Sequence, residues 1–120
     1  MSYIVDLIER LLVTRETLGN FEFQILSVLL QQPQNAYGVI IRQQIKERTN
    51  RDVSVGALYT ALDRLERKGF VSSWWGEPTA ERGGRRKRYY KIEAAGVEAI
   101  NRSRDTLANF ATPALVGAQP

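Results

Sequence analysis

The side chains that most often catalyse reactions or bind metals are absent from this chain or scattered along it. None of its 120 residues is a cysteine or a histidine, which excludes a disulfide framework, a thiolate or imidazole metal site, a cysteine nucleophile and a Ser-His-Asp triad. A paired-carboxylate site is the remaining option, but Glu77, Glu81 and Glu93 lie in or beside one basic segment with no evident pocket. The sequence therefore predicts a protein that is not an enzyme and that uses no metal or cofactor.

Positive charge is the chemical property that the sequence concentrates in one place. The chain has 17 Lys and Arg against 13 Asp and Glu, a net charge of +4. Residues 82–91 hold six basic side chains and no acidic one, namely Arg82, Arg85, Arg86, Lys87, Arg88 and Lys91. A solvated charge run is one interpretation. Because like charges at this density repel one another, a polyanionic partner is the favoured one, with the basic tip beside phosphates or in a minor groove.

Residues 54–68 could read base edges. Leu58, Leu62 and Leu65 recur at i, i+4 and i+7 and predict a helix, with Ser54 as its N-cap. With that stripe turned inward, small residues, hydroxyls and a guanidinium face outward, as a helix in a major groove requires. These candidates are Ser54, Gly56, Tyr59, Thr60 and Arg64. An ordinary surface helix explains this segment equally well on its own, and the basic segment decides for nucleic acid.

The elements that would position these residues follow from the hydrophobic periodicity and the turn signals. The first predicted element is a helix at 3–12, and three further helices follow at 21–32, 37–48 and 54–68. Asn35 is the predicted N-cap of the helix at 37–48, and Gly69 ends the helix at 54–68. Strands at 70–75 and 87–92 flank a loop at 76–86, and a last helix runs from 93 to Pro113. Three helices followed by a hairpin with a basic loop form a winged helix-turn-helix, mostly α with a small β-hairpin. The predicted divisions are 1–14, an amphipathic helix; 15–92, the winged domain; 93–112, a dimerisation helix; and 113–120, a flexible tail.

Both outer helices carry apolar stripes that a small three-helix core does not need. The stripe residues are Ile4, Leu7, Ile8, Leu11, Val97, Ile100, Leu107 and Phe110. Packing onto the chain's own domain is possible, but a second subunit is the favoured partner, because two half-sites need a twofold connector. A membrane anchor at 3–12 is disfavoured, because its polar face has Asp6, Glu9 and a single Arg10. With no apolar stretch near the roughly 20 residues of a membrane span and no signal peptide, we expect a cytoplasmic protein.

Aromatic pairs occupy both predicted strands. Neighbours on a strand point to opposite faces, so one of Trp74 and Trp75 is expected inside and the other outside. A place in the core and rim of the sheet is favoured over a platform on which a ligand or a base stacks. Of Tyr89 and Tyr90, one is expected to pack the hairpin and the other to reach a phosphate.

Over residues 18–100 the chain resembles the PadR-like family of bacterial transcriptional regulators. The motifs that carry the resemblance are LGNFEFQILSVLL (18–30), AYGVIIRQQI (36–45), VSVGALYTALDRLERKGFV (53–71) and GEPTAERGGRRKRYYKIEAAG (76–96). The resemblance implies a homodimeric repressor that binds a palindromic operator in double-stranded DNA. Helix 54–68 would enter the major groove, the wing at 76–88 would contact the backbone or the minor groove, and Tyr37 of the Tyr37-Gly38 pair would contact a phosphate. Many members of the family are controlled by an inducer, so the resemblance allows a small-molecule inducer of unidentified chemistry and does not require one.

The chain departs from the family pattern in three places. Glu93 stands where the family often has a threonine that caps the last helix, the C-terminal helix is short and has no tryptophan, and the helix at 3–12 is not a general family feature. A site in which tryptophans enclose an aromatic drug is therefore not expected.

The alternative function is a protein-interaction module that docks through its outer helices and basic hairpin. An RNA-binding winged domain is a weaker third option.

Overall fold

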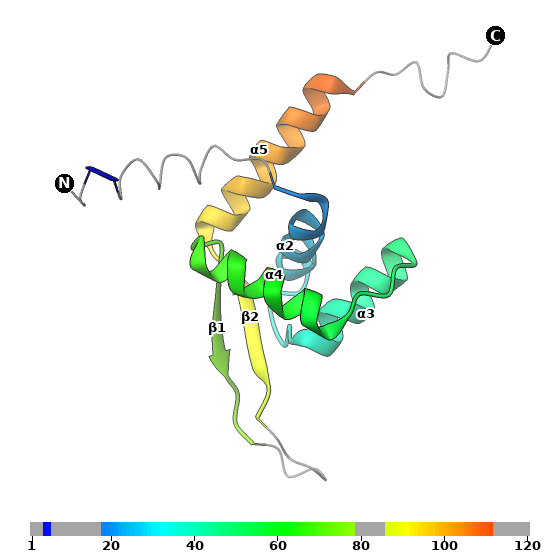
Figure 1. Cartoon of the computed structure of the whole chain (residues 1–120), viewed down its shortest axis with the longest axis vertical. Coiled ribbons are helices and arrows are strands. Elements are labelled where there is room, and N and C mark those ends of the chain that lie inside the picture. The colour runs from blue at the N-terminus through cyan, green and yellow to red at the C-terminus, as the bar shows by residue number, and fades with distance from the viewer. Residues whose placement is uncertain (1–3, 6–17, 79–85, 112–120) are drawn as a thin grey trace.

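Four helices and one β-hairpin make up the part of the chain that the computed structural model describes, residues 4–5, 18–78 and 86–111 (Figure 1). The elements are α2 (Asn20–Gln31), α3 (Gly38–Thr49), α4 (Val55–Arg67), β1 (Val71–Trp75), β2 (Arg88–Ile92) and α5 (Ala94–Phe110). The predicted winged helix-turn-helix is confirmed. The hairpin projects from the helices on one side, while the far end of α5 points the opposite way (Figure 1).

The hydrophobic core lies where α2 meets the other helices and the base of the hairpin. Its apolar side chains are spaced three and four residues apart on each helix, so each helix turns one face inward. The fully buried members include Ile25, Leu26, Leu29, Ile41, Ile45, Leu58, Leu62, Leu65 and Ile100. This burial supplies most of the stability and fixes the orientation of α4.

The start of α3 differs from the sequence prediction. The N-cap of α3 is Tyr37 and not Asn35, because Asn35 adopts a left-handed conformation with φ 62° and forms the preceding turn. Tyr37 is extended and forms an isolated antiparallel bridge with Tyr89. The amide of Tyr90 donates to the carbonyl of Ala36 at 2.9 Å. The chain before α3 is thus joined to β2, which ties the helix-turn-helix to the wing.

Helix α4 has the caps that the sequence predicts. The Oγ of Ser54 accepts a hydrogen bond from the amide of Ala57 at 3.1 Å. At the other end Gly69 has φ +80°, a conformation that costs glycine little. The amides of Gly69 and Phe70 donate to the carbonyls of Glu66 and Leu65, both at 3.0 Å. This is a Schellman motif, and it turns the chain from α4 directly into β1.

The hairpin is antiparallel with Val71 opposite Ile92 and Trp75 opposite Arg88. Each strand starts one residue later than predicted. Phe70 is used in the helix cap and not in the strand.

Within the described residues, no helix combines the length and the apolar character needed to cross a bilayer.

Helix α5 packs onto α2 at its N-terminal half. Its N-cap is Glu93, whose side chain makes no capping hydrogen bond and instead accepts one from the Oγ of Ser72 at 2.6 Å. Gly96 lies against β1 and β2, since a Cβ at this position would collide with the carbonyl oxygen of Phe70. The threonine cap that the family pattern favours is therefore replaced by a contact between the helix start and the hairpin.

Candidate nucleic-acid interface

The outer face of α4 presents the residues that the sequence selects for reading bases. Once Leu58, Ala61, Leu62 and Leu65 are buried, every predicted reading residue is exposed: Ser54, Gly56, Tyr59, Thr60 and Arg64. A Cβ added at Gly56 would meet no atom within 4 Å. The packing of the free protein therefore does not require a glycine there, whereas close approach of a partner to the backbone would benefit from it.

Tyr59 links α4 to the start of α3. A Cβ at Gly38 would collide with the Tyr59 hydroxyl, so the glycine leaves room for this side chain. The Tyr59 ring lies 6.5 Å from that of Tyr90 on β2. The Tyr37-Gly38 pair thus has a local structural reason, because Tyr37 starts the helix against the wing and Gly38 admits Tyr59.

Tyr37 is surrounded by residues of the wing. Its ring meets that of Tyr89 edge-on at 5.6 Å, and the Nζ of Lys87 lies 4.6 Å from the Tyr37 ring centre, a cation–π contact. The Nε of Arg86 donates to the carbonyl of Gly76 at 2.9 Å and is otherwise exposed. Arg85, the remaining predicted phosphate contact, lies outside the described residues.

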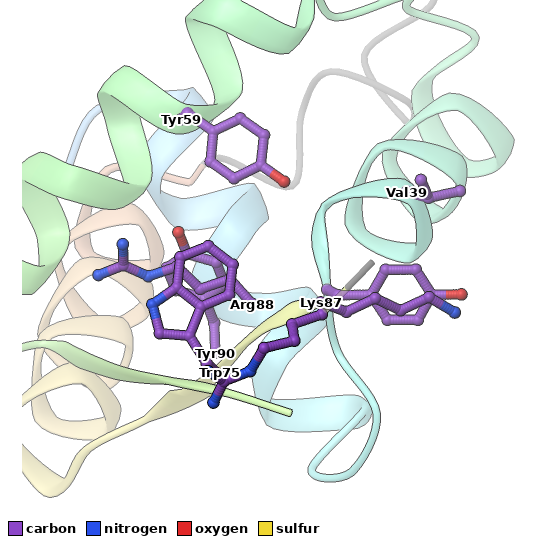
Figure 2. Close-up of a pocket in the computed structure, with 8 residues that line it drawn as sticks. Val39, Tyr59, Trp75, Lys87, Arg88 and Tyr90 are labelled. Carbon is purple, nitrogen blue, oxygen red and sulfur yellow. The ribbon is translucent and has the colours of Figure 1, made fainter. Parts of the chain in front are cut away.

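These side chains enclose a groove between α3, α4 and the hairpin, which we call the helix–wing groove (Figure 2). Its volume is about 450 Å³, and it is lined by Tyr37, Val39, Tyr59, Trp75, Arg86, Lys87, Arg88 and Tyr90. Burial raises the pKa of the Tyr90 phenol, although the nearby Arg88 opposes that effect. The groove offers hydroxyls, aromatic rings and cations to a ligand, a combination suited to a polyanion with planar groups.

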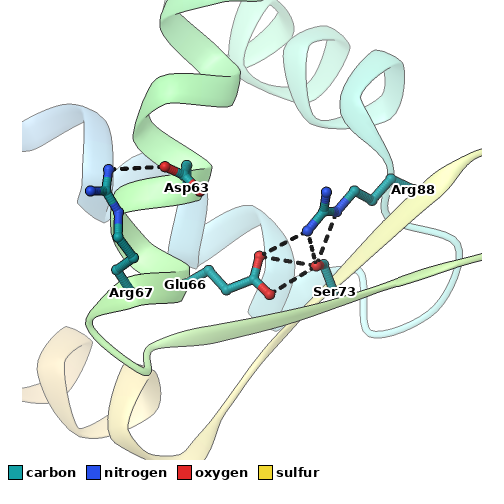
Figure 3. A network of polar contacts seen from close by, with 5 residues as sticks. All are labelled: Asp63, Glu66, Arg67, Ser73 and Arg88. Atoms are coloured by element: carbon teal, nitrogen blue, oxygen red, sulfur yellow. Dashed lines mark hydrogen bonds and ion pairs between the residues drawn. The ribbon is translucent and has the colours of Figure 1, made fainter.

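Arg88 has partners within the chain. Its guanidinium turns toward α4, where Glu66 and Ser73 hold it (Figure 3). Its Nη2 lies 3.4 Å from Glu66 Oε1, and the rings of Trp75 and Tyr90 lie 5.5 and 5.8 Å from its central carbon. Arg88 therefore has a structural role in the free protein, and its contact with DNA stays a prediction. The sequence interpretation overlooked Glu66 and Ser73.

The two tryptophans overturn one prediction. Trp74 and Trp75 are 43% and 54% exposed, so neither packs into the core. They are the last two residues of β1, at the end of the hairpin that projects from the helices (Figure 1). Trp74 stacks on Tyr89 with ring centres 5.9 Å apart, and Trp75 lines the helix–wing groove. For the tyrosines, the expectation that one packs the hairpin is confirmed by the buried Tyr90.

The predicted dimerisation residues divide into three groups. Ile100 is fully buried in the chain's own core, so its assignment to a dimer interface is wrong, and Val97 is half-buried. Leu107 and Phe110 are 65% and 81% exposed, and Ile4 is exposed as well. Leu7, Ile8 and Leu11 lie outside the described residues. The apolar face of α5 therefore continues beyond the part that α2 covers.

Metal-binding chemistry finds no support in residues 4–5, 18–78 and 86–111. Nowhere in them do three His, Cys, Asp or Glu side chains gather in a way that could hold an ion. The polar groups around the helix–wing groove are hydroxyls and cations, which can donate hydrogen bonds to an anion.

A helix-turn-helix followed by a wing, with cations and aromatic rings between the two, defines the winged-helix class of DNA-binding folds. The sequence pattern described as the transcriptional regulator PadR-like family matches residues 25–102, and the chain belongs to this family. The protein is therefore a transcriptional regulator with a DNA-binding fold, and not an enzyme.

Similar proteins agree with this assignment. An uncharacterised protein from Lysinibacillus sphaericus is 34% identical over 80 residues, which cover 65% of this chain and 69% of that protein. The crystal structure of a PadR family transcription regulator from Clostridium difficile is 26% identical, covers 77% of this chain and 91% of that one, and gives a TM-score of 0.65. The structure of a transcriptional regulator from Clostridium thermocellum is 27% identical, covers 74% of this chain and 83% of that one, and gives a TM-score of 0.63.

Proposed function

We propose that the protein is a homodimeric repressor that binds a palindromic operator in double-stranded DNA. In this proposal α4 enters the major groove and the wing, residues 76–88, contacts the backbone or the minor groove. The observation that carries the proposal is the helix–wing groove, in which Tyr59 from the exposed face of α4 and the cations of the hairpin line one surface. Such a surface can read base edges and neutralise phosphates at the same time.

The groove supports a specific path for one DNA strand. A strand that leaves the major groove at α4 reaches the wing by crossing the groove, where Tyr37 and Lys87 lie together. Lys87 and Arg86 would neutralise phosphates, and the hydroxyl of Tyr37 would donate to a phosphate oxygen. Thr60 and Arg64, on the exposed face of α4, would contact base edges.

The C-terminal part of α5 supports the dimer in this proposal. Leu107 and Phe110 are strongly exposed apolar side chains on a helix whose other end is packed. The far end of α5 and the hairpin point in opposite directions (Figure 1), so a dimer contact there leaves the wing free. We assign residues 15–92 to the DNA-binding unit, 1–14 and the exposed end of the helix in 93–112 to the dimer contact, and 113–120 to a tail.

An inducer, if the regulator has one, has a cavity of suitable size in the helix–wing groove. Its volume of about 450 Å³ falls within the range of about 300–1,000 Å³ typical of small-molecule sites. A ligand in this groove would occupy the path proposed for the DNA strand. Induction would then be direct competition and would not need a change in the dimer.

Fluorescence anisotropy tests the proposal. The protein is titrated onto the DNA upstream of its own gene and onto a scrambled duplex, at two salt concentrations. We expect a preference of about a thousandfold or more for the native fragment and a steep fall in affinity with salt. An absence of binding at low salt would contradict the proposal and leave the winged protein-interaction module as the alternative.

A further inference from the structure

The side chain of Arg88 is fixed by groups from two elements. Its Nε and Nη2 donate to the Oγ of Ser73 at 3.0 and 2.8 Å, and the Oγ of Ser73 lies 2.9 Å from both carboxylate oxygens of Glu66. Nη2 also contacts Glu66 Oε1 directly at 3.4 Å. Figure 3 shows the resulting cluster, in which α4 supplies the carboxylate, β1 the hydroxyl and β2 the guanidinium.

Aromatic rings fix the remaining surface of the guanidinium. Its central carbon lies 5.5 Å from the ring of Trp75 and 5.8 Å from that of Tyr90. The side chains of Arg88 and Glu66 are only 39% and 34% exposed, so the pair is partly shielded from solvent. A planar guanidinium can satisfy a hydroxyl, a carboxylate and two rings at once, and a lysine cannot.

The cluster lies where the hairpin leaves the helices. Trp75 and Arg88 form the last register pair of the hairpin before the loop, whereas the base of the hairpin is held by the cap of α4. A contact at the outer end has the longer lever arm about that base. The bond between Arg88 and Glu66 therefore restrains the angle between the wing and α4, together with the bridge between Tyr37 and Tyr89.

We propose that Glu66 is a positioning residue for DNA binding, and that Arg88 holds the wing at the angle at which wing and α4 engage the same duplex. This inference rests on the proposed function. It assigns a favourable role to a carboxylate on the helix that would face DNA. Long-range electrostatics alone predicts the opposite effect for Glu66, because a negative charge near the phosphates weakens binding.

The substitution Glu66→Gln separates the two effects. It keeps the shape of the side chain and removes its charge. If Glu66 acts through Arg88, we expect DNA affinity to fall about tenfold with an unchanged salt slope, because no phosphate contact is lost. Ser73→Ala, which keeps both charges, should weaken binding by several-fold as well.

Asp63→Asn is the matched control. Asp63 is on the same helix, and its carboxylate pairs with Arg67 at 2.9 Å, with both side chains mostly exposed (Figure 3). This substitution removes the same charge without touching the wing. We expect DNA affinity that is equal to that of the parent or higher.

Arg88 variants distinguish a residue that holds the wing in position from a residue that binds a phosphate. A phosphate ligand would tolerate Arg88→Lys, and Arg88→Ala would lower the salt slope by about 0.9. If Arg88 holds the wing in position, both variants lose affinity about equally and neither changes the salt slope. The double variant Glu66→Gln, Arg88→Ala should bind no worse than Arg88→Ala alone.

A readout without DNA tests the cluster itself. The chain has two tryptophans, so in a Trp74→Phe background the emission reports on Trp75 beside Arg88. We expect Glu66→Gln and Arg88→Ala to shift this emission and Asp63→Asn to leave it unchanged. Circular dichroism of each variant establishes that the helices are intact.

The outcomes separate the two proposals. A parent protein that shows no preference for its own upstream DNA overturns the proposed function. A parent that binds specifically, together with a Glu66→Gln variant that binds as tightly or more tightly, overturns the positioning role of Glu66 and leaves the proposed function in place. If Glu66→Gln leaves the emission of Trp75 unchanged, that result also contradicts the proposal that Glu66 positions the wing through Arg88.

Discussion

At the scale of single residues, small side chains matter here for the neighbours they admit. Gly38 is in a helix, where alanine is intrinsically more stable by about 1 kcal/mol. Its Cβ would nevertheless collide with the hydroxyl of Tyr59. The choice between glycine and alanine at this position is therefore decided by a side chain of the neighbouring helix and not by helix propensity.

We expect Gly38→Ala to lower the free energy of unfolding when Tyr59 is present and to lower it much less when Tyr59 is phenylalanine. The phenylalanine lacks the hydroxyl with which the new methyl group collides. Urea denaturation of the two single variants and the double variant measures this coupling. Equal effects of Gly38→Ala in both backgrounds would show that Tyr59 does not impose the glycine.

A second residue-scale prediction concerns Arg86, which lines the helix–wing groove. Replacement by alanine should weaken binding to all DNA sequences alike and lower the salt slope by about one, because one phosphate contact is lost. Titrations of specific and scrambled duplexes at several salt concentrations provide the test. Arg104→Ala, at an exposed position on α5, is the control for loss of one positive charge, and an equal effect of this variant would remove the special role of Arg86.

At the scale of elements, the caps of α4 connect stability to presentation. Ser54 accepts from the amide of Ala57 and starts the helix that presents Thr60 and Arg64. We expect Ser54→Ala to cost about 1 kcal/mol of stability, and Ser54→Asn to cost much less because it retains a capping oxygen. Thermal or urea unfolding distinguishes them, and identical losses would mean that the hydroxyl does not cap.

The elements themselves were largely predictable from the sequence, because each helix has one apolar face and recognisable ends. Ser54 and Gly69 mark α4 by chemistry that acts within a few residues. The errors arise where distant segments decide: Tyr37 replaces Asn35 as the N-cap because β2 pairs with it, and Trp74 and Trp75 are both exposed because the strand continues past the helices. A local pattern contains neither fact.

The candidate site was predictable in its composition and not in its geometry. The exposed face of α4 follows from the leucine stripe, and for this reason the residues predicted to read bases are all exposed. The pairing of Arg88 with Glu66 depends on the strand register and on the angle of the hairpin, which a loop of unknown conformation leaves open. A count of basic residues therefore assigned Arg88 to DNA, although a carboxylate of the same chain holds it.

At the scale of the whole molecule, the wing and the exposed end of α5 lie at opposite ends of the described structure (Figure 1). We expect Leu107→Ser combined with Phe110→Ser to abolish the dimer and leave the fold intact, because both side chains are already exposed in the single chain. Sedimentation equilibrium measures the mass, and circular dichroism the fold.

DNA binding by the same variant gives a further check at this scale. A monomer should lose the advantage of two linked half-sites and bind the full operator about as weakly as a half-site. Ala108→Ser, at an exposed position on the same helix, is the control for a new hydroxyl. A variant that remains dimeric would place the subunit contact elsewhere.

The contribution of α5 to the core has a consequence for the order of synthesis. Ile100 is completely buried together with side chains of α2, and the amide of Leu18 near the start of α2 donates to the Oγ of Ser103. Helix α5 follows α4 and the wing in the chain, so part of the apolar face of α2 has no cover until α5 has been synthesised. A prematurely terminated chain would contain α4 and the wing and yet lack a closed core. We expect such fragments to be degraded and not to accumulate as monomers that occupy the operator without repressing it.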